Sequence, residues 1–145
     1  MRHPCLVLFA AMLWPALALA DEPIGQIKTG SGSVTLTHAG HQSTAGPGDR
    51  VYQADVLTTG PDGSVGITFD DNSMMSLGPD SELALDQFHF DRTTHQGLFD
   101  SSLHKGTLAV KSGQIVQETP EAMHVQTPAM ILGVRGTEFV VRAEQ

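Results

Sequence analysis

The chain has 145 residues, 40% of them hydrophobic, and a net charge of −8 at pH 7. This length suits one domain that buries a real core. Nucleic acids and anionic lipid surfaces require a clustered basic face, so an acidic chain with its lysines and arginines scattered singly is expected to bind neither.

The first twenty residues have the pattern of a secretion signal. Arg2 gives a short basic start, an apolar run follows from Leu6 to Leu19, and Ala18-Leu19-Ala20 fits the small-x-small cleavage pattern. The alternative is an uncleaved anchor, but the run is shorter than the roughly 18 residues that span a membrane. We therefore expect residues 1–20 to be removed as a signal peptide and residues 21–145 to act in the periplasm.

Cysteine usage agrees with this location. The only cysteine, Cys5, lies inside the expected signal peptide and has no lipobox around it, so we predict no lipid anchor. The mature chain would contain no thiol. It would have to fold on packing alone, without disulfides or thiolate metal ligands.

After the signal, the hydrophobic pattern has a period of two almost everywhere. Turn-forming clusters rich in Gly, Pro, Asp and Asn separate the runs at residues 46–49, 60–63, 70–73 and 78–81. The sequence therefore predicts a single all-β domain at 21–145, its core within about 24–142, folded as a solenoid-like roll or a compact β-sandwich. The residues expected to be largely buried are Val65, Ile67, Phe69, Leu83, Leu85, Leu108, Val110, Phe139 and Val141.

The segment TPAMILGVRGTEFVV, which begins at Thr127, is the most informative part of the chain. Pro128 breaks an extended run, and Gly133 and Gly136 are expected to bracket Arg135 in a tight turn before the last strand. A lone cation between two glycines can be a solvated turn residue. It can also clamp a neighbouring carboxylate or be presented to a partner. We favour the clamp, because an acidic chain offers many carboxylates.

Several motifs together resemble the FecR-like domain family, named after the periplasmic part of the iron-dicitrate regulator. The segment from Thr127 is similar to the closing motif of that family. Earlier matches are Gly48-Asp49, VLTTG at 56–60, the hairpin at 64–73, GPDSEL at 78–83 and KGTL at 105–108. Asn72 stands where the family usually has glycine. The resemblance covers roughly residues 24–142.

The resemblance implies a non-enzymatic interaction, sensory or scaffold module that binds an envelope protein. The partner would be an outer-membrane receptor, an OmpA-like protein or an inner-membrane sensor. Regulators of the family carry an anti-sigma segment and a membrane helix before this domain, whereas a signal peptide occupies that place here, so we expect a free-standing secreted form. The candidate interaction or clamp residues are Arg135, Gly133, Gly136, Thr137, Thr127 and Pro128.

The alternative is an envelope hydrolase or a metal-dependent enzyme. Its serines, histidines and aspartates lie outside any Gly-x-Ser-x-Gly or His-Glu-x-x-His motif, so we assign no catalytic residue and expect no cofactor or metal. His38 and His41 flank two residues and could face one metal ion, but a third ligand is not identifiable. Ordinary surface histidines are the simpler interpretation.

Overall fold

The computed structural model describes residues 21–144, so the predicted signal peptide lies outside the described residues. Within them, strands predominate and the all-β prediction is confirmed. The one helix of these residues is α1 (Gln114–Glu118), and none is long and apolar enough to cross a membrane. The strands are β1 (Gly25–Ser31), β2 (Val34–His38), β3 (His41–Thr44), β4 (Arg50–Val51), β5 (Val56–Thr59), β6 (Ser64–Phe69), β7 (Met74–Leu77), β8 (Glu82–Phe90), β9 (Gly97–Lys111), β10 (Met123–Gln126), β11 (Ile131–Gly133) and β12 (Glu138–Ala143).

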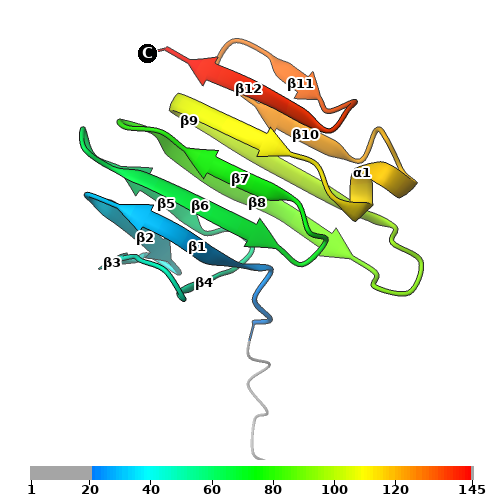
Figure 1. Ribbon diagram of the computed structural model, residues 1–145, viewed down its shortest axis with the longest axis horizontal. Helices are drawn as coiled ribbons and strands as arrows, with labels where there is room; N and C mark the ends of the chain where they lie inside the picture. The colour runs from blue at the N-terminus through cyan, green and yellow to red at the C-terminus, as the bar shows by residue number, and fades with distance from the viewer. Residues whose placement is uncertain (1–20, 145) are drawn as a thin grey trace, which may run out of the picture.

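The strands form one curled, 12-stranded sheet (Figure 1). Its main path runs β3-β2-β5-β8-β9-β7-β6-β1-β4, and β10 and β12 also pair with β9. The long strand β9 therefore belongs to both halves of the sheet: its first part lies between β8 and β10, and its last part lies between β7 and β12. The chain passes repeatedly between the halves, and the curled sheet has the form of a half-barrel.

A glycine allows β9 to bend from one half of the sheet into the other. Gly106 has a φ of +92°, which side chains rarely adopt, and it lies against Ser81 in the turn before β8. Pairing with β8 ends at Lys105, and pairing with β7 begins at Leu108. Gly106 is therefore the point where the sheet turns back on itself.

An aromatic cluster joins the two halves across the core. The ring of Phe69 on β6 lies 4.6 Å from that of Phe99 on β9, in an edge-to-face arrangement, and Phe88 on β8 lies 5.0 Å from Phe99. All but one of the residues predicted to be largely buried are 7% exposed or less. Phe139 is the exception: it is only partly buried and packs at the margin of the core. The prediction for Phe139 is therefore wrong, because β12 lies at an edge of the sheet.

Candidate interaction site

The structure divides the predicted site residues between the two ends of the β10–β11 hairpin. At one end, Thr127 and Pro128 form the hairpin turn, in which the Thr127 amide donates to the Met130 carbonyl at 2.8 Å. At the other end, Arg135, Gly136 and Thr137 form the loop between β11 and β12. Three residues of β11, about 10 Å of strand, separate the two groups. The six residues are therefore not one cluster.

The expected tight turn between two glycines is only partly correct. Gly136 has a φ of +129°, so this position does use the conformational freedom of glycine. Gly133, in contrast, is the last residue of β11 and pairs with His124. A Cβ atom at Gly133 would meet nothing within 4 Å, and its φ is not in the left-handed region. Neither backbone conformation nor close packing requires glycine there.

The backbone of the loop that carries Arg135 is fixed from both sides. The Val134 side chain is 2% exposed, and its amide donates to the Met123 carbonyl at 3.0 Å. After Arg135, the Ser112 hydroxyl donates to the Gly136 carbonyl at 2.6 Å, and the Ser112 amide donates to the Thr137 carbonyl at 2.8 Å. These contacts hold the loop against the end of β9.

The Arg135 side chain itself lies in solvent. Its Nη2 atom is 2.9 Å from Oε1 of Glu121, but both side chains are 76% exposed. An exposed ion pair contributes only about 0–1 kcal/mol to stability. Arg135 and Glu121 lie on the rim of a depression of about 630 Å³, which α1, the residues after it and the loop 135–137 line. A fixed backbone therefore carries a solvent-exposed guanidinium beside a shallow hollow.

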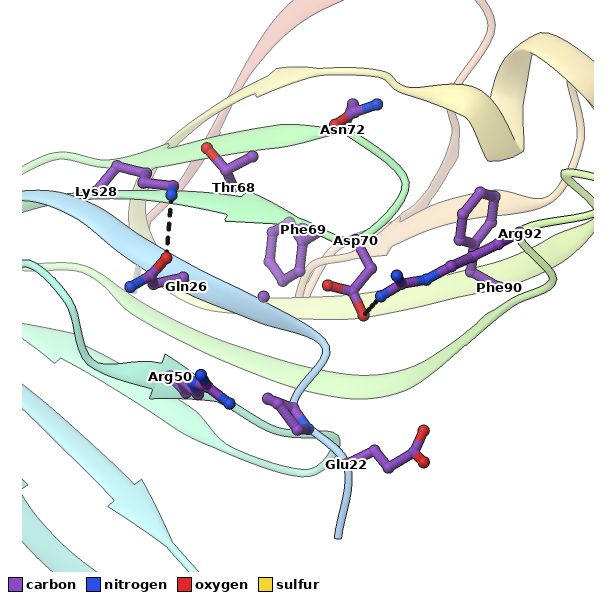
Figure 2. Close-up of a pocket in the computed structure, with 12 residues that line it drawn as sticks. Glu22, Gln26, Lys28, Arg50, Thr68, Phe69, Asp70, Asn72, Phe90 and Arg92 are labelled. Atoms are coloured by element: carbon purple, nitrogen blue, oxygen red, sulfur yellow. Dashed lines mark hydrogen bonds and ion pairs between the residues drawn. The ribbon is translucent and has the colours of Figure 1, made fainter.

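A second surface brings together cations that the sequence analysis treated as scattered. Lys28 on β1, Arg50 on β4 and Arg92 after β8 line one groove of about 820 Å³ (Figure 2). Asp70 lies 3.5 Å from Arg92, and the carboxylate of Glu22 lines the same groove, so acidic groups offset part of the positive charge. The description of the cations as singly scattered is wrong for these three. The sheet brings β1, β4 and the end of β8 together, and sequence spacing alone could not show this.

In the β2–β3 hairpin, one of the two histidines, His38, has a structural contact. His38 and His41 face each other across the hairpin, as their spacing suggested. However, the Nδ1 atom of His38 lies 2.5 Å from Oδ1 of Asp55. Asp55 is 1% exposed, and its Oδ2 atom accepts a hydrogen bond from the Tyr52 amide. Among residues 21–144, no three His, Cys, Asp or Glu side chains are arranged to hold a metal ion.

Serine, histidine and aspartate side chains also meet on the outer face of β9 and β10, but in two separate pairs. The Ser102 hydroxyl donates a hydrogen bond to Oδ2 of Asp86. The Nδ1 atom of His124 lies 3.0 Å from Oδ1 of Asp100. In a Ser-His-Asp triad, the serine hydroxyl is hydrogen-bonded to the histidine. In the described part of the chain, no such bond joins Ser102 to His124.

Residues 55–145 match the model of the family described as FecR protein. The chain belongs to the FecR family. Searches of curated proteins and of solved structures gave no match. FecR proteins function in envelope signalling with membrane partners, and the FecR domain is typically periplasmic.

Three of the earlier FecR-like motifs meet in one hydrogen-bond network around the buried residues Thr59 and Ser81. The Thr59 hydroxyl donates to the Gly78 carbonyl at 2.6 Å and accepts the Ser81 amide at 2.9 Å. The Ser81 hydroxyl in turn accepts the Thr107 amide at 3.0 Å. These residues come from the VLTTG, GPDSEL and KGTL motifs, and the network lies beside the bend at Gly106. These three motifs therefore stabilise the fold, whereas the loop around Arg135 is exposed and is the candidate for recognition.

Proposed function

We propose that this chain is a periplasmic FecR module that takes part in envelope signalling by binding a membrane protein, without catalysing a reaction. The loop 134–137 is the part that the partner contacts. The observation that carries this proposal is the 76% exposure of Arg135 on a loop whose backbone is hydrogen-bonded on both sides. Because the backbone of this loop is already ordered, binding has to order only the Arg135 side chain.

We propose that Arg135 exchanges its ion pair with Glu121 for an ion pair with a carboxylate of the partner. In the free protein, Arg135 pairs with Glu121, and solvent weakens this pair. A carboxylate of the partner would enter the depression beside α1 and pair with the guanidinium. Binding would exclude water from this pair. A bidentate arginine–carboxylate pair is stronger there than at a free surface. Buried arginines of this kind are enriched among residues that dominate binding energy.

We favour a role of Arg135 in binding a partner over a role as an internal clamp. Glu121 is the carboxylate that the clamp requires, but exposure of both groups limits what the pair adds to stability. Arg135→Lys retains the charge and loses the planar fork, so it separates the two roles. Presentation predicts an unchanged melting temperature and weaker partner capture. The clamp predicts a lower melting temperature in the isolated domain.

The experiment is capture of detergent-solubilised envelope proteins on the purified domain, with the bound proteins identified by mass spectrometry. We expect Arg135→Lys to reduce capture of a specific membrane protein at least tenfold, about 1.4 kcal/mol. Arg92→Lys is the matched control, because Arg92 is 79% exposed and also ion-paired. Capture that Arg92→Lys abolishes and Arg135→Lys leaves intact would assign recognition to the groove of Figure 2 and refute our assignment.

A further inference from the structure

The open edges of the sheet differ sharply in their capacity to pair with another strand. Within residues 21–144, one side of each of β3, β4, β11 and β12 has no neighbouring strand. β4 has two residues and β11 has three. β3 has the sequence HQST, which is polar throughout. Proteins commonly protect edge strands by making them short or polar. β12 has six residues, EFVVRA, so it is the longest of these four edge strands and carries apolar as well as charged side chains.

The exposed residues of β12 combine apolar surface with both signs of charge. Val140 is 70% exposed, the largest exposed fraction among the exposed large hydrophobic residues of the described chain. Glu138 and Arg142 are exposed on the same face of the strand as Val140, because alternate residues share a face. Phe139 and Val141 point to the other face, toward the core. Figure 1 shows β12 at one end of the molecule, with β11 at the same end.

The charge pattern of β12 is self-complementary. When a second copy of the strand runs antiparallel with Val140 opposite Val140, Glu138 of each copy lies opposite Arg142 of the other. Phe139 of each copy then lies opposite Val141. Directly opposed side chains in an antiparallel pair have Cβ atoms about 4.5–5.5 Å apart, and opposite charges at that spacing are favourable. A register shifted by one residue in either direction would lose both charge pairs.

We propose that two copies of this chain form a two-fold dimer by antiparallel pairing of their β12 strands, centred on Val140. The pairing joins the two sheets into one across the dimer axis. It uses the same surface on both copies, so the assembly closes at two and does not extend into a fibre. The exposed Val140 side chains become cross-strand neighbours, and the open backbone groups of β12 gain hydrogen-bond partners.

The contacts that the dimer replaces in the single chain are weak. Arg142 lies 3.8 Å from Glu144, with the two side chains 74% and 83% exposed. The net charge of −8 repels the two copies, but at physiological salt a Debye length of about 8 Å screens most of that repulsion. Two six-residue strands bury less than the roughly 1,200–2,000 Å² of a standard stable interface. We therefore expect a reversible dimer whose population rises with protein concentration.

Charge reversal tests the proposed register. Glu138→Arg places arginine opposite Arg142, and Arg142→Glu places glutamate opposite Glu138, so each variant alone should be monomeric in sedimentation equilibrium over a range of concentrations. Mixing the two variants restores both opposite pairs and should restore the dimer as a heterodimer. Both positions are exposed, so each variant should fold, and circular dichroism is used to check this.

Three outcomes would overturn the proposal. The native chain could remain monomeric at its highest soluble concentration. It could dimerise while neither single reversal has an effect, which would place the interface elsewhere. The folded variants could also remain monomeric after mixing, although the native chain dimerises, which would exclude this register. Arg135→Lys should leave the dimer intact, so failure of this inference and failure of partner binding are distinguishable.

A disulfide test gives the geometry independently. In a chain with Cys5→Ser, Val140→Cys places the two thiols opposite each other at the dimer axis, where opposed Cα atoms lie about 4.5–5.5 Å apart. This separation is within the 4.4–6.8 Å range of disulfides. Mild oxidation should give covalent dimers. Gln42→Cys on the exposed edge strand β3 is the control and should give few. Equal cross-linking at both positions would contradict the pairing.

Discussion

Substitution of Gly106 by alanine tests the account of how β9 serves both halves of the sheet. The added Cβ atom would lie 2.0 Å from the Ser81 hydroxyl and 2.5 Å from Cα of Ser81, with φ at +92°. A left-handed φ costs a non-glycine residue about 1–2 kcal/mol. Overpacking against a backbone that cannot move aside adds about 1–3 kcal/mol. We therefore expect Gly106→Ala to lower the free energy of unfolding by about 2–5 kcal/mol.

Gly48→Ala provides the matched control. Gly48 has a φ of +95°, but a Cβ atom there would meet nothing within 4 Å. This variant should lose only the conformational part, about 1–2 kcal/mol. Urea unfolding followed by circular dichroism measures both losses on the same scale. If Gly106→Ala loses no more stability than Gly48→Ala, then the close approach of Ser81 does not constrain the bend, and our account of it is wrong.

Three further predictions concern single side chains. Phe139→Ala should lower the free energy of unfolding by about 1–2 kcal/mol, and Phe99→Ala, which removes a ring that is 0% exposed, should lower it by about 3–5 kcal/mol. Equal losses in urea unfolding would place both side chains in the core. Thr59→Val leaves a buried amide and a carbonyl without their partner and should cost about 1–3 kcal/mol, so a melting temperature equal to that of native protein would refute the role of the network. Hydrogen bonds from the backbone amides of residues 93 and 94 lower the pKa of Asp91 below 3.8 in the folded protein. The stability that the Asp91 carboxylate contributes is therefore present above pH 3.8 and is lost as the pH falls through the lower pKa of the folded state. An NMR titration midpoint of Asp91 at or above 3.8 would contradict this.

Local alternation was sufficient to predict much of the core. Val65, Ile67 and Phe69 alternate along β6 with more exposed residues, and each is 3% exposed or less. Alternation identifies which face of a strand is apolar, but not where the strand lies in the sheet. Phe139 follows the same pattern and is only partly buried, because within residues 21–144 β12 has a neighbouring strand on one side alone.

The features that local alternation did not predict depend on contacts between segments that are distant in the sequence. Thr59, Ser81 and Thr107 meet only after the sheet has curled, so their motifs gave no sign of a shared network. The groove with Lys28 and Arg92 was missed for the same reason. The closing motif reads as one unit in the sequence, but β11 separates its two ends in the fold.

The most direct test of the proposed function is photo-cross-linking in cells at the loop that carries Arg135. A photoreactive residue at Thr137, beside the depression, should form an adduct with one membrane protein of the envelope, identified by mass spectrometry. The same residue at Gln42 on β3 should not form that adduct. Arg135→Lys should remove the adduct at position 137 while the domain remains folded. An adduct that survives Arg135→Lys, or one that forms only at position 42, would contradict the account.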